Sequence, residues 1–339
     1  MIGLTGAFVV ALAVTTLTTP WVMRLAARCG AMAVPRDRDV HEAPTPRWGG
    51  MAIYAGAVVA IIAAVSYRHW RTDGANGWNL QLLGLLLGAT FIAVVGVVDD
   101  LLDLRPVWQL AAIAAAGTIL IAFGVRIEGV TNPLSGLHAG PTDTEPSRWV
   151  ALPFPVSVGA TLFWVLLVTK TVDAIDGLDG LAAGVCAISS VTLALLATTS
   201  HQPGGPAMGL VTAALAGACV GFLRLNFHPA KVFMSTVGAQ FLGLMLAGAS
   251  IVGPFKAAAA VSVLVPLLVL GVPIFDYGVV IVKRLRQGAP IMRADRRHFH
   301  HRLLDRGLTH RQAVYVIYAV TFTLCLIALL LFRYTRAGL

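Results

Sequence analysis

The sequence predicts an all-α, polytopic membrane protein with about ten transmembrane helices and a cytoplasmic active-site face. Of its 339 residues, 57% are hydrophobic and only 12% are charged, whereas a typical soluble domain is about 25% charged. Apolar runs of about 17–25 residues, the length that spans a bilayer, recur along the whole chain. Residues 1–339 are therefore interpreted as a single integral-membrane domain.

Ten apolar runs define the expected helices, and polar or Gly- and Pro-rich segments separate them. Helix ends taken from hydropathy hold to within a few residues. In chain order the expected spans are 2–23, 49–66, 80–98, 106–124, 155–172, 180–200, 206–223, 235–252, 257–282 and 313–332.

The connections between these runs alternate between two sides of the membrane, and the charges divide unequally. Most of the 25 Lys and Arg residues fall on one side, in 24–48, 99–105, the acidic stretch after the fifth run, 224–234 and 283–312. The positive-inside rule makes this side cytoplasmic and puts both termini outside. Most of the 16 Asp and Glu residues lie there too, which indicates one active face. On the other side, 125–154 is typical of an ordered loop or short hairpin.

Charge and cysteine usage exclude two other classes of protein. The formal charge of +9 is explained by basic loops that record membrane orientation, so nucleic-acid binding is not expected. The four cysteines lie in or beside apolar runs without the spacing of a metal site. They are interpreted as small core residues and not as a disulfide framework: Cys29, Cys186, Cys219 and Cys325.

Three carboxylates spaced three residues apart follow the fifth run: Asp173, Asp176 and Asp179. Carboxylates at the edge of a hydrocarbon phase are costly unless they are paired, hydrated or neutralised by a cation. Gly177 and Gly180 allow the backbone to come close to a ligand. This combination favours a functional site over the alternative, a solvated loop between helices.

A second acidic cluster ends the third run. Asp99, Asp100 and Asp103 fit one side of a helix end, because they are three and four residues apart. Adjacent carboxylates suit a hard cation such as Mg²⁺, or a general base whose pKa is raised by its neighbour. The alternative is a simple charge cluster, which would need compensation because Asp opposes the dipole at a helix C-terminus.

Two basic stretches precede apolar runs on the same side. The segment 41–50 carries Arg47, whose guanidinium can bind an anion through two parallel hydrogen bonds. The segment 224–240 brings Ser235 and Thr236 to the start of the eighth run. Either residue could cap the helix, and the free backbone N–H groups there could hold a phosphate.

A third basic stretch, 293–302, combines histidines with several arginines: Arg297, His298, His300, His301 and Arg302 among them. Three histidines within four residues, surrounded by cations, predict a polyanion site. A zinc cluster is the alternative, but the neighbouring positive charges disfavour a second positive centre.

Acids for a metal ion, glycines for close approach and a basic histidine stretch at one membrane surface indicate phosphoryl transfer from a soluble donor to a lipid. The chain resembles the polyprenyl-phosphate N-acetylhexosamine-1-phosphate transferases over nearly its whole length. The motifs that carry the resemblance are His41 to Gly50, Asp99-Asp100 with Asp103-Leu-Arg-Pro106, Asp176-Gly-Leu-Asp-Gly-Leu-Ala182, Asn226-Phe-His-Pro-Ala230 with Phe233-Met234, and His298-Phe-His-His-Arg-Leu-Leu304. The last motif, followed by Gly307-Leu-Thr-His-Arg-Gln312, is closer to the N-acetylglucosamine-1-phosphate branch than to the peptidoglycan branch.

The resemblance implies a UDP-N-acetylhexosamine donor, a polyprenyl phosphate acceptor, Mg²⁺ with Mn²⁺ as the alternative, and UMP as leaving group. It implies the plasma membrane and the first lipid-linked step of a cell-envelope polysaccharide. It puts Asp99 and Asp100 near the attacking lipid phosphate, and the histidine stretch on the diphosphate and sugar. Asp179 would contact the uracil edge, on which Phe233 would stack. Further candidates are Asp176 for catalysis and, for substrate binding, Arg47, Lys170, Asn226, Arg297 and Arg302.

Two departures from the family pattern concern the metal. Lys170 and Asp173 stand where the family usually has Asn, and Ser235-Thr236 replaces a Gly-Asp pair. We expect Asp173 to serve as a relocated metal ligand, with Thr236 beside it. The alternative is that Lys170 pairs with phosphate directly and replaces part of the role of the metal.

Two other functions stay open at this point. The first is a catalytically silent relative that binds a nucleotide-sugar or a lipid phosphate. The second is a transporter, since intramembrane acids can mark ion pathways, although the acids fall on one membrane face and no inverted repeat is visible. The sequence does not specify the oligomeric state, and a homodimer is compatible with it.

Overall fold

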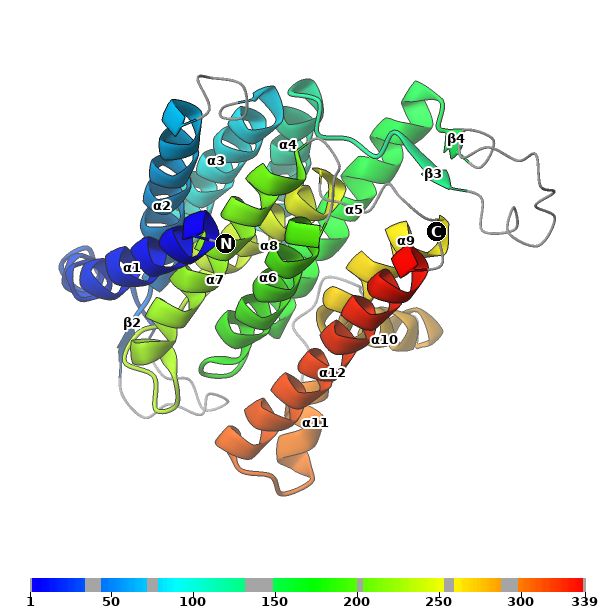
Figure 1. Cartoon of the computed structure of the whole chain (residues 1–339). Coiled ribbons are helices and arrows are strands. Elements are labelled where there is room, and N and C mark those ends of the chain that lie inside the picture. Colours follow the sequence, from blue (N-terminus) through cyan, green and yellow to red (C-terminus); the bar gives the residue numbers. More distant parts are fainter. Residues whose placement is uncertain are drawn as a thin grey trace, which may run out of the picture.

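The structure is a computed structural model that describes residues 2–33, 44–71, 79–131, 149–199, 204–252, 259–287 and 298–337. These residues form a bundle of helices with two short strand pairs (Figure 1), which confirms the all-α prediction. Eight helices in the described residues are long and apolar enough to span a membrane. They are α1 (Ile2–Arg28), α2 (Gly49–Arg71), α3 (Leu80–Leu102), α5 (Phe154–Ile175), α6 (Leu181–Thr199), α7 (Gly205–Asn226), α8 (Ser235–Val252) and α12 (His310–Ala337).

Two of the ten expected spans differ from these eight. The fourth, α4 (Pro106–Ala122), is apolar but shorter. The prediction of one helix over 257–282 is wrong, because the described part of this run forms two helices, α9 (Ala259–Val269) and α10 (Gly271–Arg286).

Proline explains the break between α9 and α10. Pro273 lacks an N–H, and its ring clashes with the carbonyl four residues earlier, which belongs to Val269. This carbonyl is the last one of α9, and the Ser189 hydroxyl of α6 donates a hydrogen bond to it at 2.7 Å. The freed backbone acceptor is thus satisfied inside the protein, as a membrane interior requires.

Small residues bring the helices close together. A Cβ added at Gly217 of α7 would lie 2.1 Å from the carbonyl oxygen of Phe8 in α1. A Cβ at Gly50, in the first turn of α2, would lie 2.1 Å from the backbone nitrogen of Gly238 in α8. Such contacts are typical of membrane helices, which associate through close packing of small residues. The Gly50 contact fixes the start of α2 against the first turns of α8.

Two antiparallel strand pairs join the helices. β3 (Gly129–Thr131) pairs with β4 (Trp149–Ala151), which confirms a short hairpin within 125–154. β1 (Met32–Ala33) pairs with β2 (Thr45–Pro46). The backbone of Phe233 is hydrogen-bonded to the end of β2 and to the residues that follow it. The Phe233 N–H donates to the Pro46 carbonyl, and the Phe233 carbonyl accepts from the Gly49 N–H, both at 2.9 Å.

The segments with acids and histidines lie at one end of the bundle. The turns after α3, α5 and α7, and the short helix α11 (Phe299–Asp305), are at the lower end in Figure 1, and the β3–β4 pair is at the opposite end. This arrangement agrees with the single active face predicted from the charges. Of the cysteines, Cys186, Cys219 and Cys325 are buried, as expected of core residues, but Cys29 is exposed, and all four are free thiols.

Candidate active site

The acid pair lies at the C-terminal end of α3. The helix ends at Leu102 because Asp103 adopts the left-handed conformation, with φ 46° and ψ 65°. The buried Asp99 carboxylate accepts hydrogen bonds from the Leu104 N–H at 3.1 Å and from Nε2 of Gln109 at 2.9 Å. These donors supply the compensation that a carboxylate needs at the negative end of a helix.

Asp100 is bonded on one side only. Its Oδ1 accepts the Thr236 N–H, in the first turn of α8, at 3.2 Å. Its Oδ2 is buried and has no hydrogen-bond partner among the described residues. An unsatisfied buried carboxylate oxygen is costly. Asp100 is therefore the member of the pair that can accept a proton or a cation.

Asp176, directly after α5, is the centre of the acidic cluster. Its carboxyl group accepts a hydrogen bond from the backbone of Ser235, so the first turn of α8 contacts two acids. Burial raises the pKa of Asp176, and the charges of three other carboxylates contribute to the same shift, which brings the pKa to about 8: Asp173, Asp100 and Asp179. Burial and the neighbouring carboxylates therefore favour the protonated form of Asp176 in the absence of a cation.

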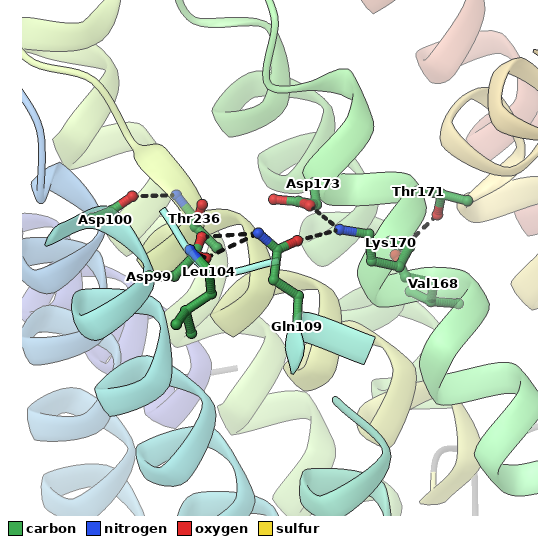
Figure 2. A network of polar contacts seen from close by, with 9 residues as sticks. All are labelled: Asp99, Asp100, Leu104, Gln109, Val168, Lys170, Thr171, Asp173 and Thr236. Atoms are coloured by element: carbon green, nitrogen blue, oxygen red, sulfur yellow. Dashed lines mark hydrogen bonds and ion pairs between the residues drawn. The ribbon is translucent and has the colours of Figure 1, made fainter. Parts of the chain in front are cut away.

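A chain of polar contacts connects α3, α4 and α5 (Figure 2). Lys170 Nζ lies 2.5 Å from Asp173 Oδ2 and 3.1 Å from Gln109 Oε1, and Gln109 Nε2 donates to both oxygens of Asp99. The structure thus pairs Lys170 with Asp173, the two residues that stand where the family usually has Asn. Gln109 is a site residue that the sequence analysis missed, although a Gln in an apolar run one turn after Pro106 was a signal for it.

Asp179 lies in a second cluster with the loop after α7. The buried Asp179 accepts hydrogen bonds from His228 Nδ1 at 2.9 Å and from the Ala230 N–H at 3.0 Å. Asn226, a predicted substrate ligand, accepts from the Gly180 N–H at 3.0 Å and donates to the Val232 carbonyl at 2.9 Å. The oxygen and the nitrogen of the Asn226 side chain thus join the turn at Gly180 to the loop after α7.

Asp179, His228 and His310 form the only group in the described residues with the spacing of three metal ligands, within 4.8 Å of one another. The two imidazole rings stack at 4.2 Å with planes only 16° apart. One ion cannot lie in both ring planes, so these rings do not form a metal site as they stand. The zinc alternative gains no support either, because His298, His300 and His301 do not gather at ligand spacing in this part of the chain.

Asp276 of α10 positions the histidine stretch. Its Oδ2 lies 2.8 Å from His298 Nδ1, and its Oδ1 accepts the Phe299 N–H at 2.6 Å, at the start of α11. The sequence analysis missed Asp276, although a single acid inside the apolar run 257–282 was a signal for it.

His300 is the buried member of the histidine stretch. Burial, together with the neighbouring His301 and His298, lowers the pKa of His300 to about 3. His300 is therefore neutral at physiological pH, so the positive charge of the predicted polyanion site comes from other residues. Arg302 is exposed, and Arg297 lies outside the described residues.

Gly177 is where the acidic and histidine segments meet. A Cβ added to Gly177 would lie 2.5 Å from Nε2 and 3.0 Å from Cε1 of His300. A side chain at residue 177 would displace the His300 ring, so the glycine permits this close approach between the two segments.

The substitution Gly177→Ala is expected to displace the His300 ring and lower turnover, by up to about 10²-fold for a shift near 1 Å. A matched control is Gly278→Ala in α10, where an added Cβ meets nothing within 4 Å. Steady-state kinetics of both variants check this. Equal turnover for Gly177→Ala and Gly278→Ala would contradict a role for the contact.

The remaining predicted residues lie at the edge of the site. Arg47 Nη1 is 3.9 Å from Asp103 Oδ1, and the 82% exposure of the Asp103 side chain makes this ion pair weak. Arg47 is thus not committed to a strong internal partner. Phe233 is half-buried beside it, since its backbone bonds to the 46–49 segment.

The sequence of the chain matches known proteins over most of its length. The family described as Glycosyl transferase family 4 matches residues 82–254. A relative in Bacillus subtilis (strain 168), named a probable undecaprenyl-phosphate N-acetylglucosaminyl 1-phosphate transferase, is 33% identical over 98% of this chain and 86% of the relative. The decaprenyl-phosphate N-acetylglucosaminephosphotransferase of Mycolicibacterium smegmatis is 34% identical over 94% of this chain and 78% of the relative.

A relative from the peptidoglycan branch matches less of the chain. The phospho-N-acetylmuramoyl-pentapeptide-transferase of Mycolicibacterium paratuberculosis is 31% identical over 72% of this chain and 75% of the relative. The longer matches to the two N-acetylglucosamine enzymes agree with the branch predicted from the motif at 298–304. The chain belongs to glycosyl transferase family 4.

Proposed function

We propose that this chain transfers N-acetylglucosamine 1-phosphate from UDP-N-acetylglucosamine to a membrane polyprenyl phosphate. An oxygen of the lipid phosphate attacks the β-phosphorus of the donor. The bond between the two phosphates of UDP breaks, so that polyprenyl-diphosphate-N-acetylglucosamine forms and UMP leaves. The observation that carries the proposal is the convergence of the α3 acid pair, the acidic turn and the histidine segment at one end of an apolar bundle, in a chain whose relatives carry this activity in their names.

Within the acid pair, the hydrogen bonds assign different roles. Asp99 is held by the Leu104 N–H and by Gln109, so it fixes the geometry of the helix end. Asp100 keeps an unpartnered oxygen, so it accepts the proton of the lipid phosphate or orients that phosphate for attack. A positioned general base contributes about 10²–10⁴-fold to a rate.

The donor is assigned to the segments around the acids. Asp179 and Phe233 would contact the uracil, supported by their positions on the two loops that Asn226 joins. His298 and His301, with Arg302 and Arg297, would hold the diphosphate and the sugar. The neutral His300 would add a hydrogen bond there, and its low pKa suits a role without charge.

A divalent cation, Mg²⁺ or Mn²⁺, is also part of the proposal. The unpartnered Oδ2 of Asp100 beside Asp176 fits a hard cation, because Mg²⁺ takes few protein carboxylates together with phosphate oxygens. Asp173 is less suited in this state, since its Oδ2 is paired with Lys170, and Thr236 offers a neutral hydroxyl. When bound, the ion would neutralise charge on the diphosphate.

A transfer assay tests the proposed function. Proteoliposomes that hold the purified protein and polyprenyl phosphate receive UDP-N-acetylglucosamine labelled in the sugar, with Mg²⁺. We expect lipid-soluble label and an equal amount of UMP, and less product with UDP-N-acetylgalactosamine. Donor binding without any transfer would instead favour the catalytically silent relative.

The active face is proposed to be cytoplasmic, in the plasma membrane, with both termini outside. The native thiol of Cys29, between α1 and β1, is exposed and would itself react with a maleimide, so it is removed first. In a Cys29→Ser background, Asp103→Cys is expected to react with an impermeant maleimide only after the membrane is permeabilised, and Val150→Cys in intact cells. Labelling of positions 103 and 150 from the same side would overturn this orientation.

A further inference from the structure

Three helices contribute to a continuous row of four polar side chains, in which one amide lies between charged groups. Asp99 at the end of α3, Gln109 in α4, and Lys170 and Asp173 in α5 contact one another in that order, as Figure 2 shows. The contact distances are 2.9, 3.1 and 2.5 Å.

The ion pair at the end of this row is partly shielded from water. The Lys170 side chain is 18% exposed and that of Asp173 is 20% exposed, so the ammonium needs a partner at this depth. The site therefore contains a stable positive charge among its carboxylates without any bound ion.

Lys170 can still bind a ligand in this position. An ammonium group has three N–H donors, and two are directed to Asp173 and Gln109. In the part of the chain that the structure describes, no third partner bonds the ammonium, so one N–H is left for an oxygen of an incoming phosphate. The four-carbon side chain can also turn away from Asp173 towards a diphosphate, which carries more charge than one carboxylate.

Gln109 is oriented by both of its neighbours. Its Nε2 faces the Asp99 carboxylate and its Oε1 faces the Lys170 ammonium, and the reverse orientation of the amide would satisfy neither. The amide separates the two charges, so that Lys170 does not form an ion pair with Asp99.

We propose that Lys170 is a resident cation of the site that binds the diphosphate of the nucleotide-sugar, with Gln109 as the positioning residue that aligns it with Asp99. This inference rests on the proposed function and adds a consequence to it. Donor binding will depend on a divalent cation only weakly, because part of the neutralising charge belongs to the protein.

The test measures binding of UDP-N-acetylglucosamine to the purified protein in nanodiscs by calorimetry, in EDTA and in Mg²⁺. The wild type is expected to bind in EDTA with a Kd within about 10-fold of that in Mg²⁺. Lys170→Met should weaken binding in EDTA by about 10- to 100-fold, as expected for the loss of a charge-assisted hydrogen bond. Lys170→Arg should restore part of the loss, and Gln109→Leu should lie between wild type and Lys170→Met.

Asp173→Asn separates this inference from the idea of a relocated metal ligand. If Lys170 is the cation that matters, this substitution releases it from Asp173, so binding in EDTA becomes tighter and the gain from Mg²⁺ is kept. If Asp173 is chiefly a metal ligand, binding in EDTA is unchanged and the gain from Mg²⁺ disappears. Melting temperatures in EDTA without ligand show whether each variant is folded.

Two outcomes overturn the inference in different ways. If the wild type transfers sugar phosphate but Lys170→Met and Gln109→Leu bind the donor in EDTA as tightly as wild type, the resident cation is wrong and the proposed function stands. If the wild type neither binds the donor nor transfers in Mg²⁺, the proposed function is wrong, and so is the inference that rests on it.

Discussion

Replacement of Asp100 by Asn is expected to lower turnover by about 10²–10⁴-fold, the contribution of a positioned general base. The amide oxygen of Asn can still accept the Thr236 N–H that now reaches Oδ1, so the start of α8 stays in place. The amide nitrogen replaces the buried, unpartnered Oδ2 and can neither accept a proton nor bind a cation. Initial rates of lipid-linked product at saturating donor, with a melting curve for each protein, measure the effect.

Asp99→Asn is the matched comparison for Asp100→Asn. Its Oδ1 would keep the bonds from the Leu104 N–H and from Nε2 of Gln109, but its amide nitrogen would replace Oδ2 and face the same Nε2, a donor against a donor. We expect a lower melting temperature and a smaller loss of turnover than for Asp100→Asn. If both variants turn over at near the wild-type rate, the acid pair has a structural role only.

The sequence predicted the helices well where hydropathy alone decides them. The apolar runs that became α1 to α3 and α5 to α8 are long, and their acid-rich ends fall at one end of the bundle, as charge counting indicated. The break at residue 270 was accessible in principle, because a proline such as Pro273 kinks or breaks a helix. Hydropathy averages over such a residue, so it predicts one helix over 257–282.

Pairs of side chains from different helices were beyond the sequence analysis. Gln109 and Asp276 each stand alone in an apolar run, and their partners are 10 and 22 residues away or more. Which residues meet depends on the crossing of helices, which hydrophobic periodicity does not specify. The Lys170–Asp173 pair is different, since residues three apart on a helix are neighbours. The sequence instead suggested separate roles, phosphate binding for Lys170 and metal binding for Asp173.

Asp276→Asn is expected to lower turnover at least about 100-fold, although Asp276 acts through His298 and not on the substrate itself. The Asp276 carboxylate lies 2.8 Å from His298 Nδ1, which places a proton on Nδ1 and leaves Nε2 of neutral His298 as an acceptor. The Asn amide can still accept the Phe299 N–H, but its nitrogen would face Nδ1 and favour the opposite tautomer. The histidine would then keep its place with its donor and acceptor exchanged.

A tautomer effect and a folding effect give different results in this experiment. If the tautomer is the cause, Asp276→Asn melts near the wild-type temperature, and His298→Gln loses about as much turnover. The double variant then loses little more than either single one, because both changes disable one group. Asp305→Asn, which removes an exposed carboxylate at the end of α11, serves as the control and should turn over normally. Additive losses in the double variant would mean that Asp276 acts on the site independently of His298.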